Sequence, residues 1–179
     1  MKVTQFSNNF SDVLISSGVN FSDNRGSLKK TIFGDNLIDL MGDIKELLCV
    51  TSNKNVIRGM HFQKLPYMTS KFVTCTSGSI LDVFINIDKS SNQFGQIGSI
   101  NLNESDNIAI YIPEGYAHGY LVKSLKATVV YLQSENYQEK FDGCINPLSL
   151  NFNWGVKKPI LSKKDSNAIT FENFSEENF

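Results

Sequence analysis

Histidine is scarce in this chain of 179 residues, which contains only two, and cysteine occurs three times without a close pair. A catalytic metal centre built from about three histidines and a carboxylate therefore lacks its ligands. Cys49, Cys75 and Cys144 are odd in number and form no CxxC pair. This spacing suggests neither a disulfide framework nor a zinc site, and it favours reduced thiols in a cytoplasmic protein.

The sequence also lacks an excess of charge and a long apolar run. Its net charge of -1 indicates no nucleic-acid or anionic-membrane partner. No stretch approaches the roughly 20 apolar residues that span a bilayer. The first ten residues lack the apolar core of a signal peptide, so we expect a cytoplasmic location. The length and the ordinary hydrophobic content of 41% predict one globular domain over residues 1–179.

Short runs of β-branched and aromatic residues between turn formers predict an all-β barrel or sandwich. Residues 71–76 and 80–87 flank a Ser77-Gly78 turn and are interpreted as a hairpin. Further strands are expected at residues 97–102, 108–112, 120–122 and 127–132. Apolar residues at three-to-four spacing predict a helix over residues 35–48, and a shorter helix is expected after Asp165. The tail from residue 172 to 179 is acidic and aromatic, and either docking or fraying fits it.

A first cluster of chemistry-bearing residues contains Arg25, Arg58 and His61. Both arginines precede glycine, which lets the backbone turn beside a guanidinium suited to phosphate oxygens. Each Arg-Gly pair alone is more typical of a solvated turn. Gly59 can introduce a bulge that changes the face of the sheet to which the His61 side chain points. From these residues alone, a hydrogen-bonded core histidine is the favoured interpretation.

The second cluster is the segment from residue 112 to 120, IPEGYAHGY, which contains His118. Its proline, glycines and histidine resemble the second motif of the cupin superfamily, whose jelly-roll barrel opens beside such a turn. His61 precedes phenylalanine and does not stand in the His-x-His pair of metal-binding cupins. A barrel of this kind would act without a metal, or would only bind a ligand.

Seven ordered motifs between Phe21 and Asp165 closely resemble the dTDP-4-dehydrorhamnose 3,5-epimerase family. They include FSDNRGSL, VIRGMHFQ, SSNQFGQ, IPEGYAHGY and LSKKD, the last of which ends at Asp165. Lys71 with the later Asp82-Val83 matches a strand pair of the family, and Tyr131 and Tyr137 keep its tyrosine spacing. The resemblance implies a cupin-like jelly roll with a few short helices. It also implies a homodimer in which N-terminal strands, about residues 1–33, cross to the partner.

The resemblance also assigns expected roles to individual residues. His61 would be the general base, oriented by Asp165, and Tyr131 would be the acid on the opposite face. Lys71 would stabilise an enolate oxygen. The expected substrate-binding residues are Arg25 and Arg58, which would hold a diphosphate, together with Gln63, His118 and Tyr137. Rival interpretations are a core aromatic for Tyr131, an exposed strand lysine for Lys71 and a helix N-cap for Asp165.

This set of residues suits proton transfer beside a ketone. Hydrogens on the carbons flanking the C4 ketone of a 4-keto-6-deoxy sugar are acidic because the carbanion becomes an enolate. A histidine can accept such a proton near neutral pH, and a cation stabilises the oxygen charge. A phenol on the other face completes the inversion. No NAD, flavin or metal is required, so no cofactor is expected.

Three departures from the family pattern lie on the nucleotide side. Residues 48–55, LCVTSNKN, replace a longer polar stretch, Lys30 stands where a glutamate is expected, and residues 85–88 read INID in place of V-D-I-R. A GDP-linked substrate, including a heptose, is therefore an alternative to a dTDP-linked one. We expect the product to enter surface-polysaccharide synthesis, such as that of capsule or lipopolysaccharide.

Four alternative functions remain open at this point. Within the same substrate class they are epimerisation at C3 alone and a 3,4-ketoisomerase. From another class comes a cupin that binds a nucleotide sugar without catalysis. A metal-dependent oxygenase is disfavoured by the two histidines.

Overall fold

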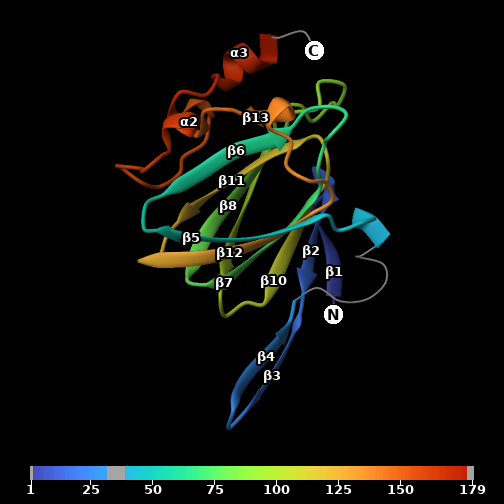
Figure 1. Ribbon diagram of the computed structural model, residues 1–179, viewed down its shortest axis with the longest axis vertical. Helices are drawn as coiled ribbons and strands as arrows, with labels where there is room; N and C mark the ends of the chain where they lie inside the picture. The colour runs from blue at the N-terminus through green and yellow to red at the C-terminus, as the bar shows by residue number, and fades with distance from the viewer. Residues whose placement is uncertain (1, 32–38, 177–179) are drawn as a thin grey trace.

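In the computed structural model, which describes residues 2–31 and 39–176, two antiparallel sheets form a barrel (Figure 1). The six-stranded sheet has the order β1-β2-β10-β7-β12-β5, and the five-stranded sheet has the order β13-β6-β11-β8-β9. A separate hairpin, β3-β4, projects away from the barrel (Figure 1). This is the predicted all-β, cupin-like architecture. No helix among the described residues has the length and apolarity needed to span a membrane.

The elements have the following bounds. The six-stranded sheet contains β1 Lys2–Ser7, β2 Phe10–Ser17, β10 Ile108–Ile112, β7 Lys71–Ser77, β12 Lys126–Gln133 and β5 Glu46–Asn53. The five-stranded sheet contains β13 Asp142–Cys144, β6 Ile57–Gln63, β11 Tyr116–Val122, β8 Ser79–Asn86 and β9 Ile97–Asn103. The projecting hairpin contains β3 Val19–Asp23 and β4 Gly26–Lys30. The helical elements are η1 Glu139–Phe141, η2 Pro147–Ser149, α2 Lys163–Ser166 and α3 Phe171–Glu176.

Two apolar clusters hold the barrel together. Inside it, alternate residues of both sheets pack around Phe84, whose ring meets those of Phe6 and Phe10 edge-on at 5.0 and 5.1 Å. On the outer face of the five-stranded sheet, the C-terminal segment covers a second cluster. There the buried ring of Phe174 contacts Phe62 at 5.5 Å between centroids. The described part of the acidic, aromatic tail is therefore docked.

The predicted hairpin of residues 71–76 and 80–87 is wrong in its pairing. Both strands exist, but β7 pairs with β10 and β12 whereas β8 pairs with β11 and β9. Gly78, with a φ of +76°, makes the expected turn, and this turn carries the chain from one sheet to the other. Turn chemistry marks a change of direction but does not specify the partner of the next strand.

The predicted helix over residues 35–48 is also wrong beyond its middle, and residues 32–38 lie outside the described part. Residues 39–41 are helical, and Gly42 follows with a φ of +64°, the left-handed conformation that commonly ends a helix. Leu47 and Leu48 belong to β5, whose alternating burial matches a strand. Apolar residues three to four apart, which suggested a helix, also fit in part the two-residue period of a strand.

Candidate active site

A cavity of about 230 Å³ lies between β5, β12 and β7 of one sheet and β13, β6 and β11 of the other. Seven of the nine residues expected from the sequence line it: Arg58, His61, Gln63, Lys71, His118, Tyr131 and Tyr137. An eighth, Asp165, is bonded to His61, and the ninth, Arg25, lies elsewhere. The fold thus gathers residues from six separate elements around one space.

A bulge in β6 places Arg58 and His61 in the same cavity wall. The register with β11 pairs His61 with His118 and Arg58 with Tyr120, so β6 contains one extra residue. Gly59 adopts a φ of +131°, and a Cβ built there would lie 2.5 Å from the Cα of Gly119. The bulge expected at Gly59 is therefore confirmed, and it requires glycine at this position.

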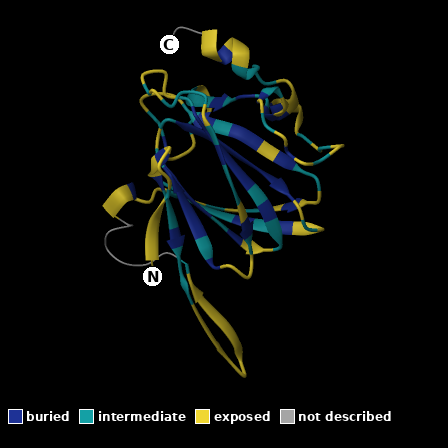
Figure 2. Cartoon of the chain, turned by 180° about the vertical axis from the view of Figure 1, so that it is seen from behind, coloured by how far each residue is buried: buried dark blue, intermediate teal, exposed yellow. Residues whose placement is uncertain are grey.

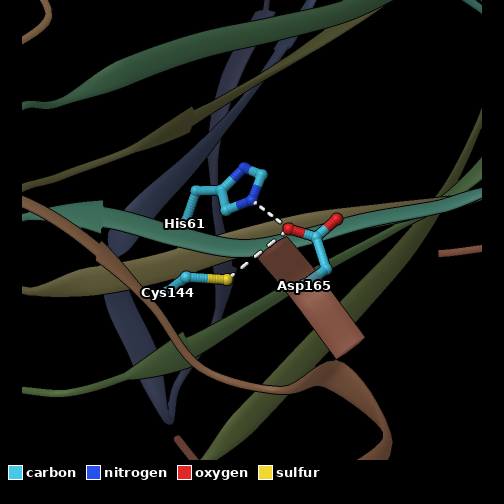
Figure 3. A group of neighbouring side chains, drawn as sticks. All are labelled: His61, Cys144 and Asp165. Carbon is cyan, nitrogen blue, oxygen red and sulfur yellow. Dashed lines mark hydrogen bonds and ion pairs between the residues drawn. The ribbon is translucent and has the colours of Figure 1, made fainter. Parts of the chain in front are cut away.

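His61 is held by a carboxylate behind it. Its Nε2 lies 2.7 Å from Oδ1 of the buried Asp165, and its own side chain is 38% exposed (Figure 3). It is therefore not a sealed core histidine. Burial alone would raise the pKa of Asp165, but hydrogen bonds from His61, Ser162 and Cys144 hold that pKa below its usual value. The N-cap of α2 is Ser162, whose hydroxyl accepts from the backbone N–H of Asp165, so the N-cap interpretation of Asp165 is wrong.

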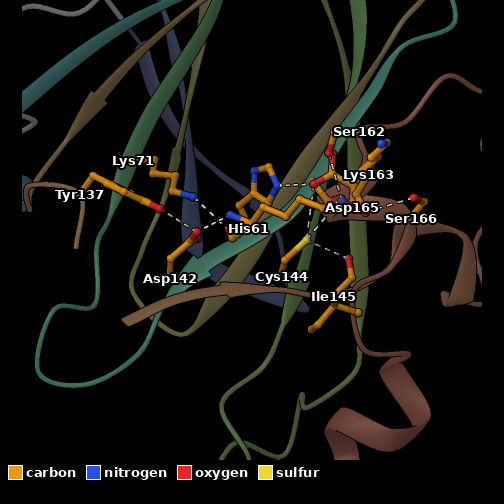
Figure 4. Close-up of polar contacts among 12 residues, drawn as sticks. His61, Lys71, Tyr137, Asp142, Cys144, Ile145, Ser162, Lys163, Asp165 and Ser166 are labelled. Atoms are coloured by element: carbon orange, nitrogen blue, oxygen red, sulfur yellow. Dashed lines mark hydrogen bonds and ion pairs between the residues drawn. The ribbon is translucent and has the colours of Figure 1, made fainter. Parts of the chain in front are cut away.

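Lys71 is buried beside His61 and is not an exposed strand lysine. Its Nζ donates a hydrogen bond of 3.1 Å to the backbone carbonyl of His61 (Figure 4). Burial lowers the pKa of Lys71 to about 8, although the charges of Asp82 and Asp142 act in the opposite direction. At this position the cost of burying the charge therefore outweighs the attraction of the two carboxylates.

Tyr131 approaches the cavity from β12, on the sheet opposite His61. Its ring lies 5.8 Å from that of His118 and 6.4 Å from that of Tyr120. Burial and the neighbouring Tyr120 and Asp82 raise the pKa of Tyr131 well above 10, so its phenol is protonated at neutral pH. One side of the ring packs on the barrel core, as the rival interpretation held, and the ring also lines the cavity.

A second histidine–carboxylate pair lies deeper in the barrel. His118 Nε2 is 2.8 Å from Oδ2 of Asp82, and both side chains are buried. Asp82 Oδ1 has no hydrogen-bond partner within the described residues. The sequence identified His118 without its partner. The signal was present, because Asp82 belongs to the strand pair quoted for the family resemblance.

Arg58 marks the end of the cavity near β5. Its Nε donates to Ser52 Oγ at 2.8 Å, and Ser52 lies 3.3 Å from the Tyr120 hydroxyl. The residues of β5 that precede Ser52 on the same face, Leu48 and Val50, also line the cavity. The departure from the family pattern in this segment therefore places apolar side chains in the wall.

The mouth contains two residues that the sequence analysis did not single out. Asp142 Oδ2 accepts a hydrogen bond of 3.1 Å from the Tyr137 hydroxyl (Figure 4). The same oxygen pairs with the Lys164 ammonium. Gln63 fixes the loop that carries Tyr137, because its Oε1 accepts from the Gln138 backbone N–H at 2.6 Å. The sequence pointed to these two residues only through Lys164, which directly precedes Asp165.

Arg25 is the expected site residue that this chain does not bring to the cavity. It lies on the turn of the β3-β4 hairpin, and its side chain is 86% exposed. Its guanidinium pairs with Asp23 at 2.5 Å. In Figure 2 the hairpin is exposed along most of its length, well away from the barrel.

Comparison with known proteins identifies relatives over most of the chain. A family model described as dTDP-4-dehydrorhamnose 3,5-epimerase matches residues 7–173. A protein of that name from Shigella flexneri is 35% identical over 165 residues, covering 89% of this chain and 91% of its own.

Two solved structures share the fold. The rmlC epimerase of Mycobacterium tuberculosis has a TM-score of 0.88 and 31% identity, covering 97% of this chain and 90% of its own. ChmJ, a 3′-monoepimerase from Streptomyces bikiniensis in complex with dTDP-quinovose, has a TM-score of 0.85 and 26% identity, covering 93% and 86%. With a family model that matches nearly its whole length, this chain belongs to the dTDP-4-dehydrorhamnose 3,5-epimerase family of sugar-nucleotide epimerases.

Proposed function

We propose that this enzyme inverts C3, C5 or both carbons of a nucleotide-linked 4-keto-6-deoxy sugar through an enolate. The observation that carries the proposal is the placement of His61, backed by Asp165 at 2.7 Å, in a cavity that also contains Tyr131 and Lys71. A base and a proton donor on opposing sheets suit inversion, whereas a protein that only binds sugars needs neither. The reaction belongs to surface-polysaccharide synthesis in the cytoplasm.

The proposed proton path uses both ring nitrogens of His61. When Nε2–H donates to Asp165, the lone pair of Nδ1 is available to accept a proton from the sugar carbon. As the C–H bond breaks, its electron pair moves onto O4, where the Lys71 ammonium stabilises the negative charge. The Tyr131 phenol then delivers a proton to the opposite face of the planar enolate. Exchange with water restores both groups.

The expected binding residues have a consistent arrangement. Arg58, which donates to Ser52 of β5, and Tyr137, which donates to Asp142 of β13, line the same cavity as the proton-transferring groups. A guanidinium suits the diphosphate, and an exposed aromatic ring suits a base. We assign His118 and Gln63 to shaping the sugar pocket. This chemistry uses no nicotinamide, flavin or metal.

We further propose a homodimer in which the β3-β4 hairpin reaches the partner's cavity. A two-stranded hairpin alone is marginally stable in water, yet this one leaves Phe21 and Leu28 53% and 58% exposed. The cavity of about 230 Å³ is also below the roughly 300–1,000 Å³ of typical ligand pockets. A partner's hairpin carrying Arg25 would enlarge and complete it.

Mixing two inactive variants tests this dimer. Arg25→Ala and His61→Asn are each expected to lose most activity. In mixed dimers one of the two sites has both residues, so mixing with subunit exchange should restore activity. Sedimentation should show a dimer in both variants. No recovery from a mixture shown to contain mixed dimers would contradict the exchange of Arg25.

The reaction itself is tested by solvent deuterium incorporation into dTDP- and GDP-linked 4-keto-6-deoxy sugars. Wild-type enzyme should exchange hydrogen at C3, at C5 or at both, and His61→Asn should lose exchange by at least about 10³-fold, the scale of a general base. Tyr131→Phe should allow exchange while slowing inversion. Exchange that survives in His61→Asn would reject the proposal and favour a non-catalytic binding role.

Two further questions remain within the proposal: which carbons of the sugar react, and which nucleotide the substrate carries. The same enzyme and substrates answer both. Exchange at C3 alone would make the enzyme a C3 epimerase, a possibility favoured by the similarity to a 3′-monoepimerase. Conversion to a 3-keto product would indicate a ketoisomerase. The apolar β5 wall motivates comparing dissociation constants for dTDP and GDP, and clearly tighter dTDP would remove the GDP-linked alternative.

A further inference from the structure

The thiol of Cys144 has no part in the proposed proton transfer, although it lies against the catalytic pair. Cys144 is directly opposite His61 in the β13-β6 register. Its Sγ lies 3.6 Å from Oδ1 of Asp165 (Figure 3). One nitrogen, one sulfur and one oxygen donor of these three residues all lie within 4.8 Å of one another.

The spacing of two of these donors, sulfur and oxygen, already fits a tetrahedral zinc ion. With Zn–S about 2.3 Å and Zn–O about 2.0 Å, a tetrahedral angle separates sulfur and oxygen by about 3.5 Å. The observed separation of 3.6 Å is already at that value. The His61 Nε2 to Asp165 Oδ1 distance must lengthen from 2.7 Å to about 3.3 Å to admit the ion. Nε2 must also come to about 3.6 Å from the Cys144 sulfur, from a separation of at most 4.8 Å, so the partly exposed imidazole has to rotate.

The surrounding structure holds the three donors in place before any ion binds. Two come from hydrogen-bonded neighbours, β6 and β13, and the third is fixed by the Ser162 cap at the start of α2. Three protein ligands leave the fourth tetrahedral position open. We assign that position to a water molecule, because the imidazole of His61 is 38% exposed and Cys144 is half-buried.

We propose that His61, Cys144 and Asp165 form a zinc site that switches the base off. In a neutral imidazole only one of the two ring nitrogens has a lone pair that can bind a proton or a metal. When Nε2 gives that pair to Zn²⁺, Nδ1 must carry the hydrogen and cannot accept a proton from the sugar. The thiol proton passes to solvent as the Zn–S bond forms. The inhibitory consequence depends on the proposed function, whereas the metal site does not.

Cobalt(II) provides a direct test of the site, because a Co²⁺–thiolate bond gives a charge-transfer band in the near ultraviolet. Metal-free wild-type enzyme titrated with Co²⁺ should show this band, and Zn²⁺ should displace it. Cys144→Ser should lose the band and weaken Zn²⁺ binding at least about tenfold. Cys49→Ser, which removes an exposed thiol, is the matched control and should retain both. A band that persists in Cys144→Ser, or no binding by wild type, overturns the site.

Inhibition is measured separately through deuterium exchange, each variant being compared with its own metal-free rate. Zn²⁺ should abolish exchange by wild type and by Cys49→Ser, and the zinc concentration for half inhibition should rise at least tenfold in Cys144→Ser. Zinc that binds through Cys144 without slowing exchange overturns the switch. Failure of the proposed function would instead leave metal-free wild type without exchange, and the cobalt spectra would still decide the metal site.

Discussion

The buried ammonium of Lys71 predicts that catalysis declines on the alkaline side while the fold becomes more stable. With a pKa of about 8 in the folded enzyme, the protonated fraction falls from about 90% at pH 7 to about 10% at pH 9. In the proposed mechanism only the protonated form stabilises the enolate oxygen. The value of kcat/KM, which reports ionisations of the free enzyme, should therefore fall about tenfold over this range.

The effect on stability has the opposite sign. Unfolding returns the lysine pKa from about 8 to near 10.5, so the unfolded chain binds more protons between these values, and the free energy of unfolding contributed by Lys71 rises with pH. The difference corresponds to about 3 kcal/mol at 1.36 kcal/mol per pKa unit. A loss of activity above pH 8 accompanied by constant or greater resistance to urea would separate titration from unfolding.

Substitutions at position 71 complete this test. Lys71→Met removes the cation and should reduce kcat/KM by about 10²–10³-fold, the scale of one oxyanion-stabilising group. Its remaining activity should show no decline centred near pH 8. Lys71→Arg keeps a charge that does not titrate in this range, so its decline should move to higher pH. The same alkaline decline in wild type and in Lys71→Met would refute the assignment.

Three further predictions concern packing, backbone and thiol chemistry. Phe174→Ala should lower the free energy of unfolding by about 3 kcal/mol in urea titrations, because the buried ring fills the outer cluster; a change below about 1 kcal/mol would contradict this docking. Gly59→Ala should destabilise the fold and abolish deuterium exchange, since its Cβ would collide with Gly119, and wild-type exchange in this variant would disprove the requirement. A thiol reagent should modify the exposed Cys49 rapidly and Cys144 slowly, because burial raises the pKa of Cys144 to about 12; equal rates would contradict this order.

The sequence predicted the parts of the site that depend on local pattern. The glycine at position 59 indicated the bulge before His61, whereas Lys71 and Tyr131 were expected at the site only through the family resemblance. The motif resemblance then related these separate segments to one another. Local pattern together with ordered motifs therefore predicted eight residues that the structure brings together. Seven of them line the cavity, and the eighth, Asp165, is bonded to His61.

Non-local pairing explains what the sequence could not provide. Asp142 reaches the mouth only because β13 pairs with β6, which places it opposite Gln63. Asp82 meets His118 through the pairing of β8 with β11. Neither contact leaves a periodic trace within one segment. Arg25 lies away from the cavity because the hairpin that carries it extends away from its own barrel, and only the proposed dimer would bring it to a site.

The extra residue in β6 makes an odd spacing behave as an even one. Side chains three apart on a regular strand point to opposite faces, yet Arg58 and His61 both face the cavity while Ile57 and Met60 face the outer cluster. On a strand without the bulge, the same three-residue spacing would turn either Arg58 or His61 into the hydrophobic layer, whereas deletion of Gly59 together with the bulge would leave the two side chains on one face. The bulge, rather than the number of residues alone, therefore decides whether both side chains face the cavity.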